Sequence, residues 1–250
     1  MRIGFVSDSH GNPAGLTECI RTLKSLSAES IWCLGDIVGY GSEAQGCLEL
    51  VREYCDGTLL GNHDAVVAGR MSPVGYHPEV AGTLQKARQE MSPEALDWLH
   101  SLPMEMNLSR DGFLIALTHA HPSDPHGWCY YSQDLHFSHP ASHEGQTVLC
   151  LYGHTHRPML QHASAGGERE HMQQPQSVTL KSHTKETWIA NAGSCGQPRD
   201  GDPRAACILF DTRSGELMFL RVAYDIAATQ NLFRSRGVPS FLIQRLTYGM

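Results

Sequence analysis

The sequence predicts an α/β protein, and three observations support this fold class. Short apolar runs alternate with amphipathic stretches through the first 60 residues, a pattern typical of β-loop-α units with a parallel sheet. Several of these apolar runs are followed directly by polar motifs. In an open α/β sheet such positions face the crevice in which ligands bind, so we expect a functional site at the carboxyl ends of the strands.

The first quarter of the chain alternates expected strands and helices. Leu16, Ile20 and Leu23 recur at the spacing of a helix with one buried face. Short apolar runs precede and follow that helix, as expected for strands of a parallel sheet. The expected strands are 3–7, 31–34 and 58–60, and the expected helices are 13–26 and 43–54.

The rest of the chain continues with mixed elements. Residues 65–101 are helical in character, with Pro78 and Pro93 near the starts of two helices. Residues 109–112 suit a hairpin turn because they end in Asp-Gly. Residues 162–186 lack periodicity, so we expect a polar loop or hairpin insertion there, within one domain that spans 1–250. Further expected strands are 104–108, 113–118, 148–152, 157–161, 188–190, 205–210 and 216–222, followed by two short helices between 226 and 246.

Composition limits the class of protein. The chain has 250 residues, of which 41% are hydrophobic and 18% charged, as expected for a globular protein with a sizeable core. Its net charge of −7 provides no general basic surface for nucleic acid or for an anionic membrane. The first apolar run is too short for a signal-peptide core, and the eight cysteines contain no Cys-x-x-Cys pair. We therefore expect a cytoplasmic protein with reduced thiols.

Five polar motifs follow apolar runs in chain order. Each motif alone has an ordinary explanation; Gly-Asn-His-Asp, for example, suits a helix N-terminus. Their ordered recurrence after successive strands favours a shared site instead. Their carboxylate, amide and imidazole groups are ligands that divalent cations accept. The motifs are Asp8-Ser9-His10, Gly35-Asp36, Gly61-Asn62-His63-Asp64, His119 and Gly153-His154-Thr155-His156.

The motifs are suited to two cations. Two ions about 3.5–4 Å apart need one ligand that touches both, and a carboxylate has two oxygens. We expect Asp36, the lone acid after Gly35, to be this bridging ligand. The cofactor prediction is two divalent metal ions, and the ligand types admit Mn, Fe, Co, Ni or Zn without choosing between them.

With these motifs the chain resembles the calcineurin-like metallophosphoesterases along its whole length. Gly39-Tyr40-Gly41, residues 191–205 and the tail 239–246 are similar to a bacterial branch of small single-domain members. Several members of that branch are called phosphodiesterases or diadenosine tetraphosphate hydrolases. The resemblance implies a four-layer α-β-β-α sandwich with the site at the carboxyl ends of the strands.

The resemblance also implies roles for the motif residues. His63 would donate a proton to the leaving oxygen, and Asp64 could orient its imidazole. The metals would activate a shared, bridging hydroxide for in-line attack on phosphorus. Asp8, His10, Asp36 and His156 would hold the first metal, and Asp36, Asn62, His119 and His154 the second.

Three further residues are candidates for substrate binding, each with an alternative. Asn12 could donate to a phosphate oxygen, or it could cap the helix that follows. Arg199 could clamp a phosphate, or it could belong to a structural turn. His121 could contact the substrate, or it could lie on the surface; the similar branch usually carries a small polar residue there.

The predicted function is hydrolysis of a small phosphate ester or nucleotide. The resemblance favours a phosphodiester or a dinucleoside polyphosphate as the substrate. A nuclease or a phosphoprotein phosphatase with the same metal core is the alternative, and the acidic chain counts against nucleic acid. A non-catalytic scaffold of this fold is a further alternative, although every expected metal position and the proton-donor position are filled. The sequence does not set the oligomeric state.

Overall fold

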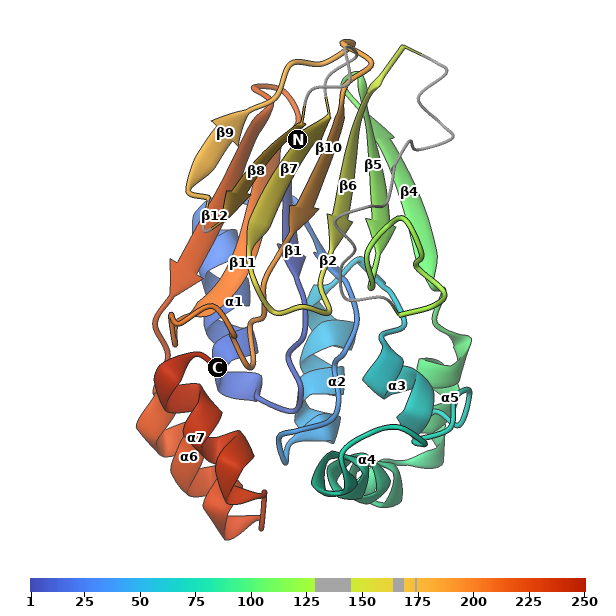
Figure 1. The fold of residues 1–250 in the computed structure, drawn as a ribbon, viewed down its shortest axis with the longest axis vertical. Helices are drawn as coiled ribbons and strands as arrows, with labels where there is room; N and C mark the ends of the chain where they lie inside the picture. The colour runs from blue at the N-terminus through green and yellow to red at the C-terminus, as the bar shows by residue number, and fades with distance from the viewer. Residues whose placement is uncertain (129–144, 164–168, 174) are drawn as a thin grey trace.

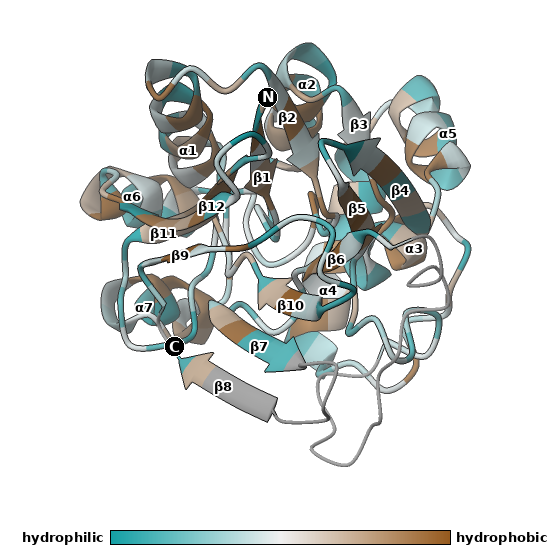
Figure 2. Ribbon diagram, turned by 90° about the horizontal axis from the view of Figure 1, so that it is seen from above, coloured by the Kyte–Doolittle hydropathy of each residue, from teal (hydrophilic) through white to brown (hydrophobic). Residues whose placement is uncertain are grey.

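The computed structural model describes residues 1–250 except 129–144, 164–168 and 174 (Figure 1). Two mixed β-sheets lie against each other, with α1 and α2 beside the first sheet and the other helices towards one end of the molecule (Figures 1 and 2). The predicted α/β fold is confirmed. No helix in the described part of the chain is long and apolar enough to cross a membrane.

The first sheet has the strand order β3-β2-β1-β11-β12-β9. β1, β2 and β3 run parallel to one another, whereas β11 is antiparallel to β1. The three parallel strands therefore direct the loops that follow them to the same end of the sheet. The strands are β1 (Arg2–Val6), β2 (Ser30–Cys33), β3 (Gly57–Thr58), β9 (Ser177–Thr179), β11 (Ala205–Asp211) and β12 (Glu216–Val222).

The second sheet has the strand order β4-β5-β6-β10-β7-β8. Its parallel strands β5, β6 and β10 are buried along their full length, which explains why their sequences are almost continuously apolar. β4 and β7 flank them in the antiparallel direction. The strands are β4 (Glu105–Arg110), β5 (Phe113–Thr118), β6 (Thr147–Tyr152), β7 (Met159–Ala163), β8 (Arg169–Gln173) and β10 (Thr187–Asn191).

The helices form three groups. α1 and α2 contact each other, and α1 also packs on β1 and β11. α3 contacts α4 and α5, and α6 contacts α7 (Figure 1). As predicted, Pro78 and Pro93 occupy the first positions of α4 and α5, where a missing backbone N–H costs nothing. The helices are α1 (Pro13–Ser25), α2 (Ala44–Tyr54), α3 (Asn62–Val67), α4 (Pro78–Glu90), α5 (Pro93–Ser101), α6 (Ile226–Ser235) and α7 (Ser240–Tyr248).

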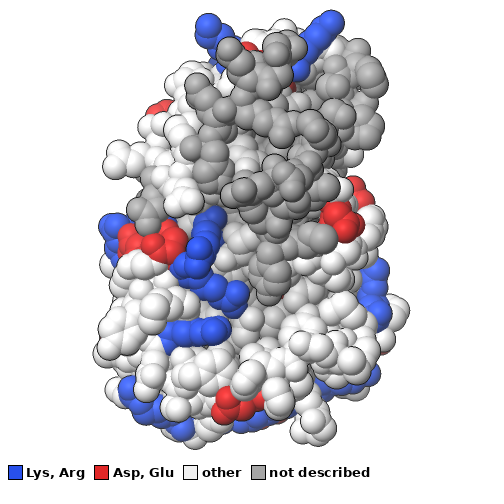
Figure 3. Space-filling view, viewed as in Figure 1, with Lys and Arg blue, Asp and Glu red and all other residues white. Residues whose placement is uncertain are grey.

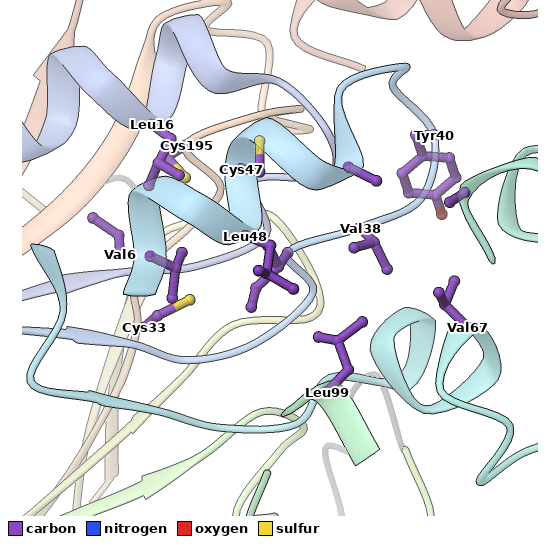
Figure 4. Packing of buried hydrophobic residues seen from close by; sticks show 14 of the residues in the cluster. Val6, Leu16, Cys33, Val38, Tyr40, Cys47, Leu48, Val67, Leu99 and Cys195 are labelled. Atoms are coloured by element: carbon purple, nitrogen blue, oxygen red, sulfur yellow. The ribbon is translucent and has the colours of Figure 1, made fainter. Parts of the chain in front are cut away.

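Two apolar clusters stabilise this arrangement. The first lies between the sheets, where the rings of Phe113 and Phe210 meet edge to face at 5.1 Å between centroids. The second lies between the first sheet and the helices and includes Leu16, Leu48 and Leu99 (Figure 4). Because both clusters reach the strand ends, the loops there rest on a rigid base.

The structure differs from the sequence prediction after β2. We expected a strand at 58–60 and helix only from residue 65, but β3 has two residues and α3 already begins at Asn62. In the segment 162–186, expected as a polar loop or hairpin, the end of β7 pairs antiparallel with β8, and β9 joins the first sheet. Residues 164–168 and 174 of this expected insertion lie outside the described residues.

Candidate metal centre

The seven predicted metal ligands lie together where the ends of the two sheets meet. All seven come within four residues of the last residue of a strand, and each is at most 6% exposed. β1 and β2 belong to the first sheet and β5 and β6 to the second, so both sheets contribute. The ligands are Asp8 and His10 after β1, Asp36 after β2, Asn62 at the start of α3, His119 after β5, and His154 and His156 after β6.

One cluster consists of Asp8, His10 and His156. The Nε2 atom of His156 lies 3.2 Å from Oδ1 of Asp8 and 3.0 Å from Nε2 of His10. Both rings donate through Nδ1 to a backbone carbonyl, His10 to Val38 and His156 to Gln197. In neutral rings with these protons, the two Nε2 atoms face each other with lone pairs. A cation between them would remove the repulsion, so this cluster fits a metal ion.

The second cluster contains Asp36, His119 and His154, with Asn62 beside them. Nε2 of His119 lies 3.3 Å from Oδ2 of Asp36 and 3.3 Å from Oδ1 of Asn62. The amide nitrogen of Asn62 donates to the hydroxyl of Tyr76 at 2.5 Å, which turns the amide oxygen towards His119. Acceptor atoms therefore converge here as well, in a set that suits a second divalent cation.

Asp36 lies between the two clusters. Its Oδ2 atom is 3.6 Å from Nε2 of His10 and 3.3 Å from Nε2 of His119, while Oδ1 accepts a hydrogen bond from the backbone N–H of His63 at 2.8 Å. Burial alone would raise the pKa of Asp36, but the positive charge of His119 and its hydrogen bond outweigh it and lower this pKa. The carboxylate is therefore anionic and within reach of both clusters, as a bridging ligand requires.

Backbone carbonyls set the orientation of all four ligand histidines. Besides His10 and His156, His119 donates through Nδ1 to Leu34 at 2.8 Å, and His154 donates through Nε2 to Trp128 at 3.0 Å. A proton held in this way leaves the opposite ring nitrogen as an acceptor. Such a second hydrogen bond is the usual support of a metal-binding histidine.

The protonation of these histidines differs in the absence of metal. Burial lowers the pKa of His154 to about 4 and the pKa of His156 to about 3, with further lowering by the charges of His119 and Arg199 respectively. Burial alone would also lower the pKa of His119, but the charge and hydrogen bond of Asp36 raise it to about 9. Two rings are therefore ready to bind a cation at neutral pH, whereas His119 must first release a proton.

The ligand loops have an uncommon backbone conformation. Non-glycine residues rarely adopt positive φ, at a cost of about 1–3 kcal/mol each. The conformation is held by hydrogen bonds between neighbouring loops, such as the N–H of Asp8 to Gly35 at 2.9 Å and the N–H of His10 to Asp36 at 3.0 Å. The ligands at positive φ are Asp8 (55°), His10 (46°), Asp36 (54°), His154 (65°) and His156 (59°).

His63 lies beside both clusters and forms a possible ligand group with His10 and Asp36. It is 3% exposed, and burial lowers its pKa well below the usual value, although the charge of Asp36 opposes this. The structure contradicts the expectation that Asp64 orients its imidazole. Both carboxylate oxygens of Asp64 are used by backbone N–H groups: Oδ1 by Ile37 and Val38, at 2.9 and 3.2 Å, and Oδ2 by Gly61, at 3.0 Å.

The sequence comparisons agree with this arrangement of clusters. Residues 1–215 match the family model described as the calcineurin-like phosphoesterase superfamily domain. The chain belongs to this superfamily. Its members are metal-dependent phosphohydrolases, and the described residues provide two carboxylate–histidine clusters for such metals.

The similarity of this phosphoesterase to its relatives covers the whole chain. An uncharacterised protein of Methanocaldococcus jannaschii is 30% identical over 247 residues, which are 99% of this chain and 98% of the relative. A solved metallophosphoesterase of Sphaerobacter thermophilus is 31% identical, with a TM-score of 0.79 over 100% of this chain and 99% of that one. A hypothetical protein of Pyrococcus horikoshii shares the fold, at 16% identity and a TM-score of 0.74 over 100% and 98% of the two chains.

Two of the expected substrate-binding residues have other partners in this phosphoesterase. Asn12 caps α1 by accepting from the N–H of Gly15 at 3.3 Å, and its amide donates to the carbonyl of Gly196 at 2.8 Å. The capping alternative therefore describes Asn12. His121 is only 2% exposed, and its Nδ1 lies 2.6 Å from the hydroxyl of Ser123. It is therefore not a surface residue.

Arg199 lies beside the metal clusters. Its backbone N–H donates to the carbonyl of His156 at 3.1 Å, and its guanidinium donates to Oε1 of Gln197 at 3.2 Å. Sequence analysis assigned no role to two tyrosines in the same region, Tyr40 and Tyr76. The position of Tyr40 between two glycines shortly after Asp36 could have indicated that it lies near the site. No pattern in the sequence around Tyr76 indicates this for Tyr76.

Proposed function

We propose that the chain is a dinuclear metal-dependent phosphoesterase that hydrolyses a small phosphodiester or a dinucleoside polyphosphate, with His63 as the proton donor. The observation that carries this proposal is the convergence of acceptor atoms. Lone pairs of His10 and His156 face each other at 3.0 Å, and Asp36 reaches both clusters. Two divalent cations would supply activation of water at neutral pH and neutralise charge on the phosphoryl group.

His63 is the group best placed to protonate the leaving oxygen. A ligand atom of its ring lies within 4.8 Å of those of His10 and Asp36, so it borders the place where a phosphoryl group would meet the metals. The hydrogen bond from its backbone to Asp36 fixes its position relative to that carboxylate. General acid catalysis of this kind contributes about 10²- to 10⁴-fold, most for leaving groups that are poor.

Cationic side chains beside the site support an anionic substrate. Arg199 has a buried Nε atom without a hydrogen-bond partner among the described residues. A group of Lys and Arg side chains lies above α6 and α7 on the face drawn in Figure 3, although the whole chain has a net charge of −7. Local positive charge raises the concentration of anions near it.

The test is hydrolysis by purified protein with and without a chelator. The panel contains a phosphomonoester, a phosphodiester and diadenosine tetraphosphate, and the bound metal is counted by elemental analysis. His63→Ala should keep both metals and lose about 10²-fold or more on substrates with poor leaving groups. His100→Ala, on the exposed side of α5, is the control and should behave as wild type.

Two results would contradict the proposal. If the protein holds two metals and hydrolyses nothing in the panel, it is not a phosphoesterase of this kind. If His63→Ala hydrolyses the poorest leaving group as fast as the wild type, His63 is not the proton donor.

A further inference from the structure

Tyr40 lies on the loop that joins β2 to α2 (Figure 4). Its ring centroid is 4.5 Å from that of His10, 4.6 Å from that of His63 and 6.3 Å from that of His156. Tyr40 is only 8% exposed. Its ring therefore packs directly on the proposed proton donor and on a proposed metal ligand.

The backbone places this ring with little freedom. Tyr40 has a φ of 52° and follows Gly39, whose φ is 91°, so two consecutive residues turn the chain in the left-handed region. The N–H of Gly41 donates to the carbonyl of His10 at 2.9 Å. A methyl group on Gly41 would lie 2.6 Å from that carbonyl oxygen, so the two loops are in the closest contact that a backbone allows.

The same ring also carries Arg199. The central carbon of the guanidinium lies 5.3 Å from the centroid of the Tyr40 ring, within the range of a cation–π interaction. Gln197 holds the guanidinium from another direction at 3.2 Å. Tyr40 thus contacts both the proposed proton donor and the cation proposed to bind phosphate.

Packing, rather than hydrogen bonding, sets the orientation of the His63 ring. Its Nδ1 atom is buried and has no hydrogen-bond partner among the described residues. The carboxylate of the neighbouring Asp64 accepts from three backbone N–H groups and forms no hydrogen bond with this ring. The ring instead lies against Tyr40 and against Tyr76, whose centroid is 5.3 Å away. A methyl group on Gly39 would come within 3.1 Å of Cγ of His63, so the backbone at Gly39 also packs closely on the His63 ring.

We infer that Tyr40 is a positioning residue of the reaction. Its ring holds the imidazole of His63 and the guanidinium of Arg199 in a fixed relation to the metal clusters, so that both act on the same phosphoryl group. This inference rests on the proposed function, because it assigns Tyr40 to the proton donor of that reaction.

The experiment compares two esters of one nucleoside 5′-phosphate that differ only in the leaving group, a p-nitrophenyl ester and an ethyl ester. For Tyr40→Ala, kcat on the ethyl ester should fall about 10- to 10²-fold, because that alkoxide needs the proton, whereas kcat on the nitrophenyl ester should stay within about threefold of wild type. KM should rise up to about tenfold on both esters as Arg199 loses its support. Tyr40→Phe keeps the ring and should restore both parameters.

Metal content and thermal unfolding are measured for each variant alongside the kinetics. The control is Tyr248→Ala, which truncates a tyrosine that is 59% exposed on α7. Should Tyr40→Ala lose metal or unfold, Tyr40→Leu fills the space without an aromatic face, and the same ratio of kcat values is measured. An unchanged ratio with both metals bound, or a Phe variant as impaired as the Ala variant, would overturn the inference. A wild-type protein that hydrolyses neither ester overturns the proposed function first and the role of Tyr40 with it.

Discussion

Gly61→Ala should disable the metal centre without changing any metal ligand. Gly61 has an ordinary backbone conformation, with φ −91° and ψ 171°, so alanine meets no conformational strain there. A methyl group at this position, however, would lie 2.7 Å from Cγ of Asp36 and closer still to its Oδ1 and its backbone nitrogen. Ordinary contact begins at 3.4 Å. Asp36, including its backbone, would therefore have to move by about 1 Å or more, which exceeds the roughly 0.2 Å that metal–ligand distances tolerate.

A displacement of this size predicts weaker metal binding and a fall in turnover of about 10²-fold. The assay is elemental analysis after dialysis, together with hydrolysis of a p-nitrophenyl phosphodiester at saturating metal. Gly82→Ala is the matched control, because Gly82 lies within α4 with open space around it. That variant should keep metal and turnover and gain about 0.5–1 kcal/mol of stability. Wild-type metal content and turnover in Gly61→Ala would refute the assignment of Asp36 as the shared ligand.

Two further predictions concern His119 and Asp64. Since the pKa of His119 is raised to about 9 by Asp36, the metal-free protein carries a proton there at neutral pH that binding must displace. The apparent metal affinity should therefore rise about tenfold per pH unit between roughly pH 6.5 and 9. Competition with a metal-binding dye measures this affinity, and an affinity that does not change with pH would contradict the prediction. Asp64→Asn should lower the free energy of unfolding by about 1–3 kcal/mol, because an amide cannot accept from Ile37, Val38 and Gly61 with both atoms. Urea unfolding of the chelated protein measures this, with Asp97→Asn on the exposed face of α5 as a control; a loss no larger than that of the control would rule the hydrogen bonds out as a source of stability.

Strands, helices and the grouping of the candidate ligands could be predicted because each has a local signal. The apolar runs of β5 and β6 reflect full burial, and Pro78 and Pro93 mark helix starts through the chemistry of the missing N–H. The placement of Asp8 after such a run was enough to locate it at a strand end. The antiparallel pairing of β11 with β1 joins residues about 200 positions apart, and no local pattern indicates it.

The surroundings of Asp64, His121 and Tyr40 could not be predicted, because they depend on partners distant in sequence. Asp64 is adjacent to His63 in the chain, but a helical turn points its carboxylate to the loop after β2. His121 follows two residues after His119 and is nevertheless enclosed beside Tyr152. Tyr40 reaches three histidines, of which two come from different loops and one from the first turn of α3. Side-chain direction after a turn depends on tertiary contacts, which a one-dimensional pattern does not contain.

The left-handed backbone of the ligand loops limits how this centre could change its metal. Asp, Asn and His are the non-glycine residues that tolerate this conformation best, and they are also ligands for hard and borderline cations. Each of these candidate ligands therefore tolerates the conformation of its turn and also offers a donor atom to the ion. They are Asp8, His10, Asp36, His154 and His156. Replacing them by Cys, Glu or Met to favour another metal would alter the loop as well as the donor atom. The range of metals that this centre could acquire through single substitutions is thus restricted by the geometry of its turns.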